Sequence, residues 1–413
     1  MDQGAATDRL RNLTDSKRRV ITLLRKNGPL TKRDLTKHGH MSWATAVKAI
    51  DQLSDDGIVQ NVGLSSRDPG RRGKTAYLYA LSSERPLAIG IDVEYSTTTV
   101  VLTDLTGQVI TNNTHKTPQQ VDDATAKDFL SFVIRDFMLE HELNSNDLDG
   151  IGIGLPGIGF PSSSIRDNIR KAQMLEHHLG DMFGMRIRVE TNTKAYAVFE
   201  KWANSTFSFT DFIFVAIRTG VGTGIFCDGS LFTGPHGLAG EIGHMKVVPN
   251  GPPCRCGSSG CLETVVNQSY LYQQYRTNVL EDDSPLPDWP GKKWLFQGLE
   301  DLFTKAKRGD EAAVRIVNAA ATYLGYGIAN AITVLDITNI IISGYFGPNG
   351  DAMLPVLDET IRERILPKVD FTVKYVPFDP TGHVRGAALL VLGEYFVDIP
   401  RDGARSTEPV LQV

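Results

Sequence analysis

One short stretch of this chain limits its possible folds more than any other part. Three cysteines and a histidine lie between residues 244 and 261, in a segment rich in glycine and proline. Three thiolates and one imidazole form the ligand set of a closed tetrahedral zinc site. The predicted ligands are His244, Cys254, Cys256 and Cys261. We therefore predict a structural zinc ion, which requires the fold to bring both ends of this stretch to one point.

Features beside the ligands support the zinc prediction. Gly257 and Gly260 permit the tight turns that let closely spaced cysteines converge on one ion. Cys227 stands apart, which fits a reducing, cytoplasmic setting where metal ligation is commoner than disulfides. The alternative is that the clustered cysteines are small buried hydrophobic residues, but their spacing beside a histidine favours a metal. Glu241 and Glu263 flank the cluster, and we expect the metal to hold them in place for another purpose.

The length and charge of the chain narrow its class. It has 413 residues, enough for two or three domains. No apolar run reaches the roughly 20 residues of a membrane span, and the N-terminus lacks a signal-peptide pattern, so we expect a cytoplasmic protein. The net charge of −5 is uneven, because residues 1–80 carry +7 and the remainder −12. A basic N-terminal module on an acidic body indicates that this end meets a polyanion.

The N-terminal sequence pattern predicts three helices. The first covers 16–24 and is ended by an Asn-Gly-Pro break. Thr31 is placed to cap the second helix, where it forms a capping box with Asp34. Ser42 is placed to cap a third helix over 43–54, whose apolar side faces inward.

A hairpin wing is predicted after the third helix, with strands over 59–62 and 76–79 and a basic turn between them. With a turn supplied by Gly39, this is a winged helix-turn-helix domain over 1–82, whose third helix lies in the major groove. The predicted DNA contacts are Ser42, Trp43, Thr45 and Lys48 on that helix and Arg67, Arg71, Arg72 and Lys74 on the wing. The alternative is a small helical protein-interaction domain, against which the basic wing argues.

From residue 86 onward, strands and helices alternate, which predicts an α/β body. The predicted strands are 87–93, 97–105, 108–112, 148–154, 212–217 and 337–343, and a long apolar helix covers 311–335. Two segments, 87–112 and 212–232, resemble each other, so we expect two lobes with a ligand cleft between them. Residues 282–292 have the composition of a surface insertion.

The chain resembles the ROK family (repressors, open reading frames and kinases), specifically its repressor branch. The most specific match is Leu-Ala-Gly-Glu-Ile-Gly-His at 238–244, followed by Cys-x-Cys-Gly-x-x-Gly-Cys-x-Glu at 254–263. The resemblance covers essentially the whole chain. It implies an actin-like, sugar-kinase (ribonuclease H-like) fold over 86–413. The boundaries that it implies are about 86–200 plus the C-terminal helix for lobe one, and about 201–380 for lobe two, with the zinc loop at 244–261.

The resemblance also implies roles for individual side chains. Zinc would be bound by the four ligands named above. A sugar would be bound by Thr191, Asn192, Glu241, His244 and Glu263. Carboxylates are good acceptors for sugar hydroxyls, and a zinc-bound imidazole is fixed in orientation, so the metal would order the loop that presents these groups. Hydrogen bonds in such a pocket discriminate strongly between related sugars.

Two departures from the family's kinases argue against phosphoryl transfer. Their Asp-x-Gly-Gly-Thr phosphate loop is replaced by Asp-Val-Glu-Tyr-Ser at 92–96. Here Glu94 adds negative charge and Tyr95 blocks close backbone approach. Their general base is replaced by Asn192, whose amide has no basic lone pair near pH 7. We therefore expect no catalytic residues and no enzyme activity.

Of two further features of the family's kinases, one is retained in this chain and the other is reduced. The glycine-rich loop at 219–224 is retained, although such loops also serve as plain strand turns. The glycine run on the adenosine side of the family's kinases is reduced to Ser-Gly-Tyr-Phe-Gly at 343–347. The second change adds to the case against kinase activity.

The expected function is a sugar-responsive transcriptional regulator, by family analogy a repressor of carbohydrate-utilisation genes. A homodimer or homotetramer would place third helices in successive major grooves of operator DNA. A sugar or sugar-phosphate effector would favour one lobe arrangement and so change the spacing of the DNA-binding domains. Two alternatives stay open: an ATP-dependent sugar kinase with a fused DNA-binding domain, and a regulator that responds to a protein partner such as a sugar-transport component.

Overall fold

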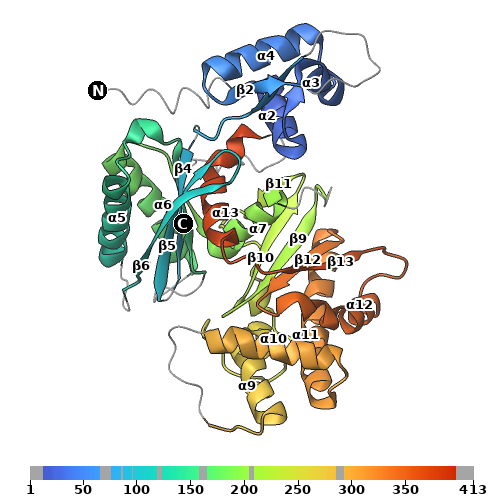
Figure 1. Cartoon of the computed structure of the whole chain (residues 1–413). Coiled ribbons are helices and arrows are strands. Elements are labelled where there is room, and N and C mark those ends of the chain that lie inside the picture. Colours follow the sequence, from blue (N-terminus) through green and yellow to red (C-terminus); the bar gives the residue numbers. More distant parts are fainter. Residues whose placement is uncertain are drawn as a thin grey trace, which may run out of the picture. The chain divides into compact units, whose positions relative to one another are not determined.

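Two compact units make up the described part of the chain (Figure 1). The computed structural model describes residues 13–65, 76–84, 87–94, 96–118, 123–157, 165–203, 209–284 and 293–396. The first unit comprises 1–156, 160–207 and 383–413, and the second comprises 157–159 and 208–382. In sequence, the second unit is therefore inserted between two parts of the first.

The first unit begins with a small helical and β-sheet region, residues 13–84, which we call the head. Its elements are α2 (Asp15–Asn27), β1 (Leu30–Thr31), α3 (Lys32–Gly39), α4 (Trp43–Asp55), β2 (Val59–Leu64) and β3 (Tyr77–Leu81). The strands form an antiparallel sheet in the order β1-β3-β2. The predicted winged helix-turn-helix is confirmed, with the addition of β1, which is too short to leave a periodic sequence pattern.

The caps predicted for the head are also confirmed. Thr31 accepts a hydrogen bond from the backbone N–H of Asp34, and the Asp34 side chain accepts one from the N–H of Thr31. Ser42 accepts a hydrogen bond from the N–H of Thr45 at 3.1 Å. These caps satisfy N–H groups that a helix leaves without partners at its start, so they fix where α3 and α4 begin.

The turn between α3 and α4 differs from the prediction. Gly39 is the last residue of α3, and the left-handed conformation falls on His40, with φ of 47°. The N–H of His40 donates to the carbonyl of Thr36 and closes the helix. The expectation that Gly39 supplies the turn is therefore wrong, because histidine is one of the non-glycine residues that adopt this conformation most readily.

The first unit continues with a five-stranded sheet. Its strands, in spatial order, are β6 (Val109–Lys116), β5 (Thr97–Asp104), β4 (Leu87–Val93), β7 (Gly150–Leu155) and β8 (Ile187–Thr191). The hairpin strands β4, β5 and β6 are antiparallel, and β7 and β8 run parallel to β4. Strand β6 extends past the predicted end at 112, because its residues alternate between half-buried and exposed and give a weak apolar signal.

A second sheet with the same strand arrangement lies in the second unit. Its strands, in spatial order, are β11 (Ser230–Phe232), β10 (Val221–Cys227), β9 (Phe212–Ile217), β12 (Asn339–Gly344) and β13 (Thr372–Pro377). Again three hairpin strands are antiparallel and two later strands are parallel to the first. The predicted resemblance between the two halves is confirmed, and the repeated sheet is that of an actin-like, sugar-kinase-like fold.

Helices cover each sheet. In the first unit they are α5 (Asp123–Glu140), α6 (Ile165–Phe183), α7 (Asn192–Ala203), α13 (Gly382–Leu392) and the short η4 (Gly393–Tyr395). Side chains of α5 and α6, such as Ile134 and Leu179, share a buried cluster with Ile89 of β4. Figure 1 shows α5 and α6 together on one side of this sheet.

The second unit has a larger apolar core. Its helices are η2 (Ile242–His244), α8 (Glu263–Val266), α9 (Gln268–Val279), α10 (Lys293–Lys307), α11 (Glu311–Leu335), η3 (Gly347–Met353) and α12 (Leu354–Arg362). Helix α11 has the predicted bounds and buries residues such as Leu324 and Ile328 against the sheet. None of the helices in the described part of the chain is long and apolar enough to cross a membrane.

The predicted surface insertion falls mostly outside the described residues. At its start, Arg276 of α9 forms an ion pair with Asp282 and donates a hydrogen bond to the carbonyl of Ser284. These contacts tie the beginning of the segment to α9. Residues 285–292 lie outside the described ranges.

Candidate functional site

The four predicted metal ligands converge in the second unit. One donor atom from each of His244, Cys254, Cys256 and Cys261 lies within 4.8 Å of the others. Cys256 Sγ is 3.7 Å from Cys261 Sγ, and Cys254 Sγ is 3.6 Å from His244 Nδ1. A tetrahedral ion with Zn–S bonds near 2.3 Å separates its sulfur ligands by about 3.8 Å. The donor set and its spacing therefore fit a tetrahedral metal ion, with Nδ1 as the histidine donor.

The loop reaches this geometry through tight backbone turns. The N–H of Cys254 donates to the carbonyl of Ser258 at 2.7 Å, and the N–H of Gly257 donates back to Cys254 at 3.0 Å. Gly257 and Gly260 have φ of 85° and 70°, as their predicted role requires. A Cβ at Gly260 would lie 1.9 Å from the carbonyl oxygen of Val248, so no larger residue fits there.

The thiols differ in acidity when no metal is bound. Burial raises the pKa of Cys254 and of Cys261 above the usual range of a thiol. Burial also acts on Cys256, but hydrogen bonds from the backbone of Ser258 and from the neighbouring thiols outweigh it and lower its pKa. Three adjacent thiolates without a cation are therefore unfavourable, and a divalent ion supplies the charge that they need.

Two carboxylates flank the ligands. Glu263 at the start of α8 is 4% exposed, and its Oε1 accepts a hydrogen bond from Cys254 Sγ at 3.1 Å. Glu241 Oε2 lies 3.9 Å from His244 Nε2. The imidazole therefore turns one nitrogen to the cysteines and the other toward Glu241. A metal on Nδ1 leaves the proton on Nε2, which can donate to Glu241 or to a ligand hydroxyl.

Arg255 is a member of this cluster that the sequence prediction missed. Its Nε lies 3.3 Å from Glu263 Oε1, and its side chain is 40% exposed. The turn between β9 and β10 lies against the same pair, since a Cβ at Gly220 would be 2.7 Å from the Arg255 guanidinium and 2.8 Å from Glu263. A basic residue between two ligand cysteines is the sequence signal that could have identified it.

The other two predicted sugar-binding residues lie in the first unit. Thr191 ends β8 and Asn192 begins α7. A Cβ on Gly154, at the neighbouring end of β7, would lie 3.3 Å from Asn192 Cα and 3.4 Å from Asp92 Oδ1. The carboxyl ends of three parallel strands thus meet around Asn192, and this edge of a parallel sheet is where α/β proteins usually bind ligands. The structure brings Thr191 and Asn192 together here, and Glu241, His244 and Glu263 together in the second unit.

Aromatic side chains close around the segment 343–347 in the second unit. The Tyr345 ring lies 3.9 Å, centroid to centroid, from Phe296 of α10 and 3.9 Å from Phe378. The Arg218 guanidinium stands over Tyr345 at 5.5 Å and over Phe378 at 5.1 Å. Bulky rings therefore fill the space around a segment that is a bare glycine run in the family's kinases.

The glycine-rich segment at 219–224 and the segment that replaces the kinase phosphate loop after β4 both lie in β-hairpins. Residues 219–224 form part of the turn after β9 and the first half of β10, and the N–H of Arg218 donates to the carbonyl of Gly220 in this turn. Strands β4 and β5 are joined by a short turn in which the N–H of Glu94 donates to the carbonyl of Thr97. Tyr95 lies outside the described residues.

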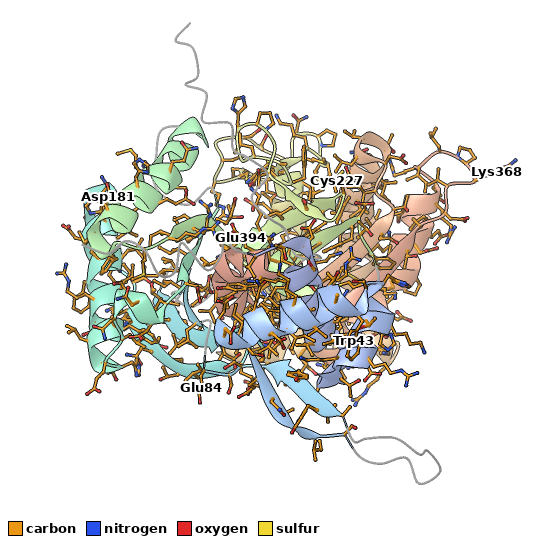
Figure 2. The ribbon with its side chains drawn as sticks, turned by 90° about the horizontal axis from the view of Figure 1, so that it is seen from above. Trp43, Glu84, Asp181, Cys227, Lys368 and Glu394 are labelled. Carbon is orange, nitrogen blue, oxygen red and sulfur yellow. The ribbon has the colours of Figure 1, made fainter. Side chains whose placement is uncertain are left out.

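The predicted DNA-contacting residues of α4 are exposed. Trp43, labelled in Figure 2, is 57% exposed, and Ser42, Thr45 and Lys48 are exposed as well. The hydroxyl of Ser42 is engaged with Thr45 as the cap, which leaves Trp43 and Lys48 as the longer side chains of this face. The wing residues Arg67, Arg71, Arg72 and Lys74 lie outside the described ranges.

Together, a winged helix-turn-helix head and two matching sheets define a class of protein that joins a DNA-binding module to a sugar-kinase-like body. Comparison with known proteins agrees. The model of the ROK family matches residues 88–394. The chain therefore belongs to the ROK family.

Three relatives illustrate the similarity. The xylose repressor of Bacillus spizizenii is 25% identical over 384 residues, covering 91% of this chain and 94% of that protein. The DNA-binding transcriptional dual regulator NagC of Escherichia coli is 25% identical, with 84% of each chain covered. A crystal structure of a ROK family transcriptional regulator, described as a homologue of the E. coli Mlc protein, aligns with a TM-score of 0.69 and 24% identity, covering 92% of this chain and 96% of that one.

Proposed function

We propose that this chain is a sugar-responsive transcriptional repressor of carbohydrate-utilisation genes. The observation that carries this proposal is the presence, in one ROK chain, of a winged helix-turn-helix head and of the carboxylate and imidazole cluster beside the metal ligands. Full-length relatives named as repressors support it. The domain division that goes with it is a DNA-binding domain over 1–82 and a cytoplasmic ROK body over 86–413.

The metal in this proposal is zinc with a structural role. Three sulfur donors and one nitrogen leave no open position for a substrate in a tetrahedral site. Zinc on Nδ1 of His244 would hold the imidazole so that Nε2 faces the same side as Glu241. The ion therefore orders the side chains that we assign to the sugar.

The sugar-binding residues that we propose are Thr191, Asn192, Glu241, His244 and Glu263. Glu263 is buried, so water does not easily supply hydrogen bonds to its carboxylate. A sugar hydroxyl that donates to this carboxylate would therefore supply an interaction that water cannot easily make. Arg255 contacts both of its oxygens, through Nε at 3.3 Å and Nη2 at 3.5 Å, and so fixes the orientation of the carboxylate. Loss of a single hydrogen bond from such a pocket is expected to distinguish related sugars strongly.

We propose that this chain does not carry out the phosphoryl transfer of the family's kinases. Asn192 cannot serve as general base, and the Tyr345 ring contacts occupy the region of the lost glycine run. We expect no sugar-dependent ATP consumption by the wild-type chain. We expect none from Asn192→Asp either, although this substitution restores the carboxylate of a general base, which raises the rate about 10²–10⁴-fold in enzymes that use one. The check is a coupled assay of ATP turnover with a panel of sugars. Turnover in the wild-type chain that rises in Asn192→Asp would establish the kinase alternative.

Operator binding is proposed to use α4 in the major groove and the wing on the backbone, in a homodimer or homotetramer. Lys48→Ala is expected to weaken binding to the DNA upstream of this gene about tenfold, because a lost base-edge contact costs about 1–3 kcal/mol. Binding is measured by fluorescence anisotropy at several salt concentrations. The matched control is Lys307→Ala, an exposed lysine of α10 that pairs with Asp351 in the second unit. If Lys48→Ala and Lys307→Ala bind the DNA with equal affinity, α4 does not contact the DNA as proposed.

A further inference from the structure

Helix α7 begins at one functional residue and ends at the head. Its first residue, Asn192, is one of the proposed sugar contacts, and Trp202 lies one residue before its end. A helix of 12 residues is about 18 Å long. All of the residues from Lys194 to Glu200 are buried, so the helix is enclosed on every side along its middle. Such a helix transmits a displacement of one end to the other as a body.

Close backbone packing holds α7 in place. A Cβ on Gly386 of α13 would lie 2.0 Å from the carbonyl oxygen of Ala195, so the two helix backbones touch. The rings of Tyr196 and His383 lie 4.4 Å apart, which adds a second contact between α7 and α13. The fit leaves little room for α7 to bend, and a change at Asn192 must move the helix against its neighbours.

Trp202 joins α7 to the head through Arg25 of α2. The Arg25 Nη1 donates to the carbonyl oxygen of Trp202 at 3.1 Å, and its guanidinium stands 5.9 Å from the Trp202 ring. The same guanidinium stands 4.9 Å from the Phe396 ring. The guanidinium of Arg385, from α13, lies 5.3 Å from the Trp202 ring. Trp202 is thus the point where α7, α13 and α2 meet.

The surroundings of this joint are incompletely packed. A cavity of about 330 Å³ lies beside it, lined by residues of α2, of β3 and of the end of α7, among them Leu24, Arg25, Leu81 and Trp202. A second contact, from Arg18 Nε to the carbonyl oxygen of Glu394 at 2.8 Å, attaches α2 to η4. These contacts attach the head to α7 and to η4, and the cavity lies directly beside Arg25.

We propose that α7 carries the effector signal from Asn192 to the head, through the contact of Trp202 with Arg25. Trp202 and Arg25 are positioning residues: they touch neither the sugar nor the bases in this proposal, and they set the position of α2 relative to α7. A ligand shifts a conformational equilibrium only through differential interactions with its two states, and here those interactions are made at the Asn192 end. The inference rests on the proposed function, because it assigns the path of the effector response.

Three variants of the full chain test the path. Trp202→Leu removes the ring beside which Arg25 and Arg385 stand and keeps the backbone carbonyl. Arg25→Met removes the guanidinium, and with it the hydrogen bond to that carbonyl. Arg19→Met is the matched control, because Arg19 also lies on α2 but donates to the carbonyl of Gly39 within the head. The first measurement is hydrogen exchange without any sugar. Amides of α2 are expected to exchange about tenfold faster in both joint variants than in the wild-type chain. Unchanged exchange of α2 in both would overturn the joint, whatever the effector is.

The second measurement is operator affinity with and without xylose, N-acetylglucosamine and other monosaccharides or their phosphates. For coupled sites, the dissociation constant for operator DNA with sugar differs from that without sugar by a factor of about 5–150. We expect the wild-type ratio to persist in Arg19→Met and to fall below about threefold in both joint variants, because coupling and not affinity is lost. Equal ratios in all four proteins would overturn the path and leave the proposed function standing. A wild-type chain that no sugar releases would instead contradict the proposed function, and this inference with it.

Discussion

Cys261→Ser is expected to lower the melting temperature of the protein and to abolish sugar binding together. Cys261 is fully buried and its Sγ is one of the four converging donors. Loss of a structural metal is among the larger single-residue effects, about 3 kcal/mol or more. For a unit of about this size, each kcal/mol shifts the melting temperature by about 2–4 °C, so a fall of roughly 6–12 °C is expected. Calorimetry and sugar titration are run on the same preparation.

The control for this variant is Cys227→Ser, which removes a thiol outside the metal cluster. Cys227 is exposed at the end of β10 and takes no part in the set of four donors. Its variant is expected to match the wild-type chain in stability, zinc content and sugar affinity. A Cys261→Ser protein that keeps its sugar affinity while losing zinc would show that the metal does not order the pocket.

Glu241→Ala is expected to abolish the sugar response while leaving operator binding intact. The carboxylate faces Nε2 of His244 in the second unit, whereas the head that we assign to DNA belongs to the first. A hydrogen bond to a charged group contributes about 1.5–3 kcal/mol, and leaving its partner unpaired adds to the loss, so sugar affinity should fall about 100-fold. Isothermal titration measures the sugar, and anisotropy measures the operator without sugar, which should stay within about threefold of wild type.

The matched control is Glu359→Ala, which removes an exposed carboxylate from α12 in the same unit. It should leave both affinities unchanged. If Glu241→Ala binds and responds to sugar as this control does, the pocket lies elsewhere in the chain.

Much of the fold is predictable from local sequence patterns. The head is specified by its caps, since Thr31, Asp34 and Ser42 mark the starts of α3 and α4 directly in the sequence. The buried strands and α11 follow from largely apolar segments. Elements without such a pattern are missed or misplaced, among them the two-residue β1, the half-exposed end of β6, and the left-handed turn at His40.

The candidate site is predictable only where its residues are close in sequence. The four metal ligands lie in one short stretch, so their spacing identifies them without a structure. The contacts of Tyr345 with Phe296 and Phe378, and of Trp202 with Arg25, join residues that are distant in sequence. No periodicity or motif reports such a contact, because it depends on how the helices pack.

Sugar-controlled repression is tested most directly by binding of the zinc-loaded protein to DNA from upstream of its own gene, with and without a panel of sugars and sugar phosphates. We expect tight, salt-sensitive binding that one sugar releases, since a basic head neutralises phosphates and the effector changes its placement. Specific binding that no sugar alters would contradict the effector role of the Glu241, His244 and Glu263 cluster. The absence of specific binding under every condition would contradict the repressor function itself.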